Sequence, residues 1–291
     1  MNVELLAGGI FVAIYVLIAT EKIHRTLAAL LGASLVIMLR ILDQREAFAY
    51  VDFNVIFLLA GMMIIANVMA KTGVFQWLAV EAVRRARGSP YRLLVLTSVL
   101  TAVASAFLDN VTTVVLLTPI TFFVAQRLGT SPVPFLISQV LASNIGGAAT
   151  LIGDPPNLLI ASAAGIDFTT FLVHMAPVSL LILGGFLVLA RVMFGGEMHR
   201  QRAVLAAFDL DESMVITDRR RLRISVTVMI LTVAGFLGAQ LLGYEPATVA
   251  LLGATVLFIV AREDPEEIFR GVDWSTLLFF VGLFIVVEGI D

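Results

Sequence analysis

The sequence predicts an all-α polytopic membrane protein with an inverted-topology repeat whose second copy is truncated. Three observations support this fold class: an apolar composition, a series of apolar segments of membrane-spanning length, and two stretches that match at one fixed offset. Of the 291 residues, 59% are hydrophobic and only 14% are charged. A soluble domain of this length does not need so much apolar surface, so we expect the chain to lie in a bilayer.

Nine apolar segments follow one another, and most are close to the ~20 residues that a helix needs to cross the hydrocarbon core. They lie at about 3–20, 26–42, 53–70, 92–127, 133–164, 171–191, 223–242, 246–261 and 274–290. The fourth and fifth segments are longer than the others, and polar residues interrupt both. We expect a first transmembrane repeat at 1–194, a cytoplasmic linker at 195–222 and the start of a second, incomplete repeat at 223–291.

The lysines and arginines indicate which side of the membrane each loop faces. If 92–127 dips into the membrane and returns, while 133–164 crosses once, 17 of the 19 positive residues lie on one side. The positive-inside rule assigns that side to the cytoplasm. The N-terminus is then outside the cell membrane, and 71–91 and 195–222 are cytoplasmic.

An internal repeat relates the two ends of the chain at an offset of 221 residues. Residues 29–39 (ALLGASLVIML) align with 250–260 (ALLGATVLFIV), and 12 of the 42 positions from 29 to 70 are identical. Two similar helices could arise by chance, but shared apolar composition does not explain three matched carboxylates. These are Asp43 with Asp264, Glu46 with Glu267, and Asp52 with Asp273.

The number of crossings decides the orientation of the second copy. The first copy has five crossings beside the 92–127 segment, and an odd number turns the second copy over in the membrane. Many secondary transporters have this architecture. Because the second copy stops where the first has reached Ala70, we expect the chain to be an N-terminal fragment of a protein of roughly 420 residues.

The first polar interruption is FLDNVTTVVLLTPI, residues 107–120. Asp109 and Asn110 lie at the centre of an apolar run, and an ionisable residue at that depth is costly and usually functional. About 16 residues on each side are short for full spans, which favours a re-entrant hairpin at 92–127 with its tip at mid-membrane. The alternative is two full helices joined by a tight turn at the outer surface.

The second interruption is SNIGGAATLIGDPPN, residues 143–157, which predicts a broken helix over 133–164. Its glycines and its Pro155-Pro156 pair disfavour a continuous helix. Non-helical backbone at this depth needs cover from protein or an aqueous cavity, and the ends of two half-helices can bind an ion or solute. We interpret the bare backbone at Gly147 as space for that solute. A kinked structural helix and a surface loop are the alternatives.

These two motifs resemble the arsenite-permease and melanocyte P-protein branch of the ion transporter superfamily, whose relatives include sodium/proton antiporters and dicarboxylate and citrate carriers. The likeness spans essentially the whole chain and is closest to the P-protein group in NIGGAATLIGDPPN. It implies two inverted repeats, a hairpin and a broken helix whose tips form the site, and a homodimer. The site residues that it implies are Asp109, Asn110, Thr112, Thr113, Ser143, Asn144, Gly146, Gly147, Thr150, Gly153, Asp154 and Asn157.

The predicted function is secondary active transport of a small inorganic ion or solute of the arsenite or cation type, coupled to H⁺ or Na⁺, and not enzymatic catalysis. The dicarboxylate carriers resemble one another in a serine where this chain has Asp109. A fixed carboxylate beside an anionic substrate costs several kcal/mol unless it is protonated, which disfavours citrate or succinate. Asp109 is the first candidate for a proton carrier; Asp154 is the second, because it could instead cap a half-helix.

Three other functions are alternatives to this prediction. They are a dicarboxylate or citrate carrier, a passive channel, and an intramembrane aspartyl protease, whose two family motifs do not match here. No cofactor beyond a coupling ion is expected, and no metal site, because the three histidines are scattered and cysteine is absent. The expected partners are the lipid bilayer and the transported solute, and the chain has no basic tract of the kind that binds nucleic acid.

Overall fold

The computed structural model describes residues 3–200, 218–262 and 264–290, and this part of the chain forms 14 helices and no strand. The all-α class predicted from the sequence is therefore confirmed. Eight helices contain or directly precede the two matching stretches at the ends of the chain: α1 (Val3–Ala19), α2 (Arg25–Met38), α3 (Gln44–Ala49), α4 (Phe53–Lys71), α11 (Arg219–Leu242), α12 (Pro246–Ala261), α13 (Pro265–Phe269) and α14 (Trp274–Glu288). We call these eight helices the repeat core.

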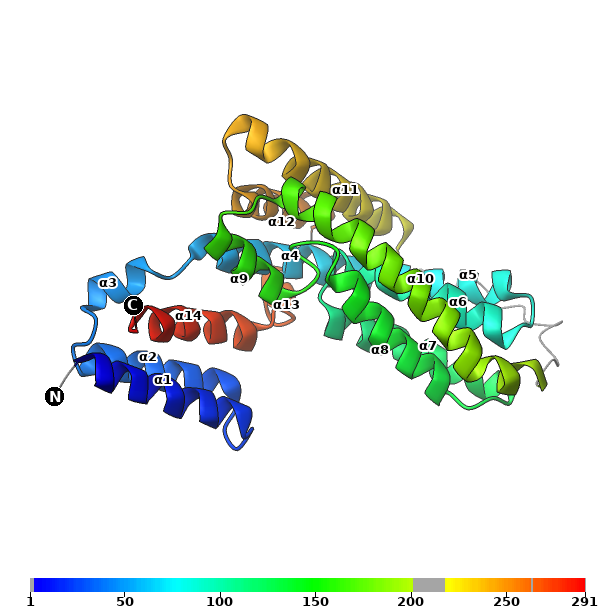
Figure 1. The fold of residues 1–291 in the computed structure, drawn as a ribbon. Helices are drawn as coiled ribbons and strands as arrows, with labels where there is room; N and C mark the ends of the chain where they lie inside the picture. The colour runs from blue at the N-terminus through cyan, green and yellow to red at the C-terminus, as the bar shows by residue number, and fades with distance from the viewer. Residues whose placement is uncertain (1–2, 201–217, 263, 291) are drawn as a thin grey trace.

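Six helices lie between the matching stretches in the chain: α5 (Val74–Ala86), α6 (Pro90–Ser105), α7 (Asn110–Leu128), α8 (Val133–Gly147), α9 (Pro155–Ala164) and α10 (Phe168–Arg200). Helices α5 to α8 and α10 gather on one side of the molecule (Figure 1), and we call them the hairpin body. Helix α9 continues beyond the break after α8 and lies against α4 of the repeat core. The break thus falls where the two groups of helices meet.

Three helical stretches are long and apolar enough to cross a membrane by length and composition: Phe53–Lys71, Phe168–Gly196 and Arg219–Ala239. Helices α6, α7 and α8 belong to a set of shorter apolar helices. Helix α10 exposes much of its apolar surface, with Leu181 77% exposed, which suits contact with lipid rather than water.

The two matching stretches pack against each other reciprocally: α2 lies against α14, and α4 lies against α12 (Figure 1). A Cβ atom at Gly61 would lie 2.8 Å from the backbone carbonyl carbon of Ala250, and one at Gly282 would lie 2.7 Å from that of Ala29. Gly61 and Gly282 are separated by the 221-residue offset, as are Ala29 and Ala250. The two close contacts are therefore copies of each other, and the glycines permit them.

The aspartates matched by the repeat begin helices in both copies. Asp43 and Asp264 are the N-caps of α3 and α13, and Asp52 and Asp273 are the N-caps of α4 and α14. In all four cases the carboxylate accepts a hydrogen bond from a backbone N–H two or three residues later. Capping satisfies amides that a helix start leaves unpaired, which explains why both copies carry these acids.

The matched glutamates have different roles in the two copies. Glu46 accepts a hydrogen bond from the backbone N–H of Asp43 at 3.4 Å and closes a capping box. Glu267 instead forms an ion pair with Lys71, whose Nζ lies 2.7 Å from Oε1. This bond from Lys71 lowers the pKa of Glu267 below its ordinary value and links the end of α4 to α13.

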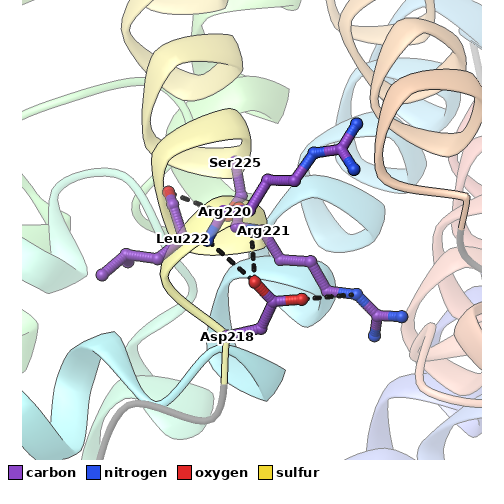
Figure 2. A network of polar contacts seen from close by, with 5 residues as sticks. All are labelled: Asp218, Arg220, Arg221, Leu222 and Ser225. Carbon is purple, nitrogen blue, oxygen red and sulfur yellow. Dashed lines mark hydrogen bonds and ion pairs between the residues drawn. The ribbon is translucent and has the colours of Figure 1, made fainter.

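Helices extend into both ends of the linker expected at 195–222. Helix α10 continues to Arg200 and α11 begins at Arg219, while 201–217 lies outside the described residues. Asp218 begins α11, because its Oδ1 accepts hydrogen bonds from the backbone N–H groups of Arg220 at 2.8 Å and Arg221 at 3.1 Å (Figure 2). These backbone bonds lower the pKa of Asp218, as expected for a carboxylate at a helix N-terminus.

Candidate functional site

The tip between α6 and α7 is organised by Asp109. Its carboxylate is the N-cap of α7, and Oδ1 accepts a hydrogen bond from the backbone N–H of Val111 at 2.8 Å. The backbone N–H of Thr112 lies 3.3 Å from Oδ1 and 3.2 Å from Oδ2. The Asp109 carboxylate therefore accepts hydrogen bonds from the first unpaired amides of α7.

The helix break spans 148–154, between the end of α8 and the start of α9, and two side chains hold it together. The Thr150 hydroxyl accepts a hydrogen bond from the backbone N–H of Gly153 at 3.1 Å and donates one to the carbonyl of Ala106 in the tip. Asn157 Nδ2 donates to the carbonyls of Gly147 at 3.0 Å and Thr150 at 2.9 Å. These bonds satisfy backbone groups that the break releases and attach it to the tip.

The three glycines of the motif permit close packing, which differs from our interpretation of Gly147 as space for a solute. A Cβ atom at Gly147 would lie 2.9 Å from the carbonyl oxygen of Gly153, so backbone already fills that position. At Gly153 it would lie 2.5 Å from the carbonyl oxygen of Ser105, and at Gly146 only 2.0 Å from that of Ala102. The glycines let α8 and the break touch the backbone of α6.

Asp154, which the sequence suggested as a possible helix cap, makes no capping bond, whereas Asp109 is an N-cap. Asp154 occupies the N-cap position of α9 but makes no side-chain capping bond. The physical reason is that Pro155 and Pro156 fill the next two positions and have no N–H to donate. The half-buried carboxylate of Asp154 has no hydrogen-bond partner within the described ranges and interacts electrostatically with Asp109.

Two asparagines connect the tip to α8. Asn110 Nδ2 donates a hydrogen bond to Asn144 Oδ1 at 2.9 Å, which leaves the carbonyl of Asn110 and the amino group of Asn144 able to bind another group. Asn144 is exposed, and Asn110 is half-buried. Together with Asp109 and Asp154 they form the polar surface where tip and break meet.

The hydroxyls predicted for the site divide into two kinds. Thr113 and Ser143 are buried, and each donates to a backbone carbonyl of its own helix region, at 3.0 Å to Asp109 and 2.9 Å to Val140. Such bonds to the preceding turn are typical of hydroxyls inside helices. Thr112 is half-buried and, with Asp109, lines a small cavity beside the tip.

Two cavities lie on either side of the break. The larger, of about 480 Å³, lies among the ends of α4, α9, α10, α11 and α12, and Leu151 and Leu158 line it beside the break. The smaller, of about 40 Å³, separates Asp109, Thr112 and Ile152 from α4 and the start of α14. The break is therefore next to one cavity lined by α4, α11 and α12 and another lined by α4 and the start of α14.

Sequence reasoning did not assign several polar residues of these cavities to the site. Asp52 and Ser162 line the larger cavity, where the Ser162 hydroxyl donates to Asp52 Oδ2, and Asn67 and Asp273 line the smaller one. In the sequence, Asp52 and Asp273 are notable only because the repeat matches them. No motif around Asn67 or Ser162 indicates a functional role. Only the tertiary packing brings Asn67 and Asp273 beside Asp109, and Asp52 beside Ser162.

A hairpin tip that meets a broken helix inside an apolar helical bundle fits a membrane transport protein. The chain belongs to the citrate transporter family (CitMHS), whose model matches residues 15–291. It is a transporter of that family, as the resemblance in the two motifs predicted.

Relatives support the same assignment. An uncharacterized transporter of Mycobacterium tuberculosis is 43% identical over 288 residues, covering 98% of this chain and 67% of the relative. A 46 kDa membrane protein of Mycobacterium leprae is 40% identical over 289 residues with the same coverage. The P protein of Homo sapiens is 32% identical over 364 aligned residues, covering 98% of this chain and 43% of that protein.

Proposed function

We propose that the protein is a secondary active transporter that moves a small inorganic cation or a neutral solute such as arsenite, coupled to H⁺ or Na⁺. The observation that carries the proposal is the pair of neighbouring carboxylates, Asp109 and Asp154, where the tip and the break meet. No lysine or arginine lines either cavity within the described residues. An anionic solute would therefore meet uncompensated negative charge, whereas a cation or a neutral solute would not.

The two carboxylates have separate roles in the proposed cycle. Asp109 holds the first turn of α7, and Asp154, without a capping partner, takes up and releases the coupling ion. Asn110 and Asn144 offer a carbonyl oxygen and an amino group beside them, which suit a small polar solute. The bond between Thr150 and the tip keeps both acids in one unit.

A gradient experiment tests this function. In proteoliposomes that contain the protein, we expect arsenite or a monovalent cation to accumulate above its external concentration only while a pH or Na⁺ gradient is imposed. Dissipating the gradient with an ionophore should stop accumulation, because the solute moves uphill only by coupling. Equilibration without accumulation would identify a passive channel.

A citrate-type anion carrier is the second candidate, because the family description names citrate. The same vesicles distinguish it: gradient-driven uptake of citrate that arsenite and monovalent cations do not inhibit would favour this candidate. The site would then have to bind the anion together with protons or a cation, since its own acids repel it.

We also propose that the N-terminus lies outside the cell membrane and that 71–91 and 195–222 are cytoplasmic. In support, Asp52, Gly165 and Gly243, from three connections expected outside, all line the larger cavity. The starts of α2 and α14, which are both expected on the cytoplasmic side, also lie together. There, Arg25 Nη2 donates a hydrogen bond to Thr276 Oγ1 at 3.2 Å.

Single cysteines report this topology directly, since the chain has none of its own. We expect an impermeant maleimide added to whole cells to label Ala164→Cys and Tyr244→Cys, both at exposed positions. Arg85→Cys, equally exposed, should react only after the membrane is opened, because α5 would face the cytoplasm. Labelling of Arg85→Cys in intact cells would contradict the topology.

A further inference from the structure

The hairpin body contains buried polar atoms without protein partners. The hydroxyls of Ser98 and Ser105 on α6 and Ser138 on α8 are in residues that are 0% exposed, and none has a hydrogen-bond partner within the described residues. Gln139, 1% exposed, donates from Nε2 to the Thr121 hydroxyl of α7 at 2.7 Å, but its Oε1 is also unpartnered. Buried polar atoms are rarely left unpaired in folded proteins, so these need another partner.

The three serines lie at successive levels along α6 and α8. Gly146 approaches the carbonyl of Ala102, and Thr150 donates to the carbonyl of Ala106, so both contacts join residues 44 positions apart. The two helices therefore run side by side in one direction with a constant register. At 1.5 Å per residue, Ser98 lies about 10 Å below Ser105, and Ser138 lies about one turn lower still.

Close packing alone does not explain these serines. Alanine and glycine already provide the close approach of α6 to α8, at Ala102 and Gly146. A hydroxyl inside a helix normally donates to a carbonyl of the preceding turn, as Thr97 does to Leu93 at 2.9 Å and Thr101 does to Thr97 at 2.7 Å. The hydroxyls of the three serines make no such bond and are therefore available to a guest molecule.

We propose that α6, α7 and α8 enclose a line of water molecules that leads from the starts of α6 and α8 to the hairpin tip and carries protons to Asp154 beside it. A buried water molecule needs two to four polar partners, and the four atoms above, with the Thr97, Thr101 and Thr121 hydroxyls, supply them. Each water or hydroxyl accepts one proton and passes on another, so only the Asp154 carboxylate gains a proton. The proton-carrying role rests on the proposed function; the water path does not.

This path supplies the second of two routes to the site. The larger cavity reaches the break from the ends of α4, α9 and α12, which we place outside. The water path reaches the tip beside that break from the opposite ends of α6 and α8, which we place in the cytoplasm. Solute and proton can then approach Asp154 from different sides.

Silver ions test the path without any transport measurement. Silver nitrate in chloride-free buffer is added to inside-out vesicles that hold Ser98→Cys or Ser138→Cys, and the remaining thiols are counted with a maleimide after denaturation. We expect both thiols to react at least tenfold faster than that of Ala254→Cys. Ala254 is 2% exposed in an apolar cluster on α12, away from the proposed path, and is the matched control.

Sidedness and folding complete this experiment. Right-side-out vesicles should protect both thiols, because the path opens at the cytoplasmic ends of the helices. Reaction no faster than that of Ala254→Cys, or reaction only from the outside, would overturn the water path. Each variant is first checked for an unchanged elution profile in detergent, and either serine position suffices for the comparison.

Alanine at the same positions tests the proton-carrying role. Ser98→Ala and Ser138→Ala keep the packing but remove a water partner, so we expect at least a fivefold slower proton flux with unchanged solute affinity. If the hydroxyls serve packing alone, flux is unchanged, and the proton-carrying role is refuted. The silver experiment measures thiol reactivity and not transport. If the proposed transport function is wrong, the silver result therefore still tests the water path.

Discussion

Asp154→Asn should abolish solute accumulation driven by a pH gradient, with a loss of at least 100-fold, while solute exchange at equal concentrations continues. Asparagine keeps the size of the side chain but cannot release a proton. The native carboxylate lacks the hydrogen bonds of a helix cap, since Pro155 and Pro156 have no N–H groups, so the substitution breaks no capping interaction. Accumulation and exchange in proteoliposomes measure the two effects, and exchange by the variant should be nearly independent of pH.

Asp109→Asn is the matched comparison, because this residue carries a defined structural role. Asparagine is also a good N-cap, so the first turn of α7 should persist, with a loss of up to about 1 kcal/mol from the missing charge at the helix start. We expect gradient-driven accumulation within about threefold of the parent protein. The opposite pattern, with accumulation lost in Asp109→Asn and kept in Asp154→Asn, would return the proton-carrying role to Asp109.

Gly146→Ala should destabilise the hairpin body by about 3 kcal/mol, the upper range for overpacking a buried site. The added Cβ atom would lie 2.0 Å from the carbonyl oxygen of Ala102 and 2.5 Å from its Cα. Both are backbone atoms of α6, so no side chain can rotate away and the two helices must separate. The thermal midpoint of the purified protein in detergent measures the effect.

Two control variants make this prediction specific. Gly184→Ala on α10 adds the same methyl group where nothing lies within 4 Å, so stability should be unchanged or slightly raised by the better helix propensity. Ala102→Gly combined with Gly146→Ala should not restore stability, because the clash involves the Ala102 backbone. A Gly146→Ala protein as stable as Gly184→Ala would contradict the close packing of α6 and α8.

The sequence predicted the features that depend on local composition. Long apolar segments indicated membrane helices because hydrocarbon requires apolar surface of a set length. The structure places the break at 148–154 and the tip at 106–109, where Gly146 to Pro156 and Asp109 had interrupted those segments. Proline and glycine affect the backbone at their own positions, so they reveal a break without any knowledge of its surroundings.

The roles of individual residues in the site depended on partners far away in the chain. Asp109 and Asp154 look alike as buried acids, and the N–H groups after Asp109 and their absence after Asp154 distinguish them only once both helix starts are known. The sequence alone suggested that the backbone at Gly147 leaves space for a solute, but in the structure the carbonyl oxygen of Gly153 lies against it.

By itself, the sequence determined the membrane class, the two interruptions and the 221-residue repeat, since all three follow from residue type and spacing along one chain. Only the tertiary structure decided that Gly61 meets Ala250 as Gly282 meets Ala29, and that Ser98 and Ser138 face each other's helices without partners. These facts depend on how whole helices pack. Packing places residues as far apart in the chain as Ala29 and Gly282 in contact, and no local pattern of residue types encodes which of them will touch.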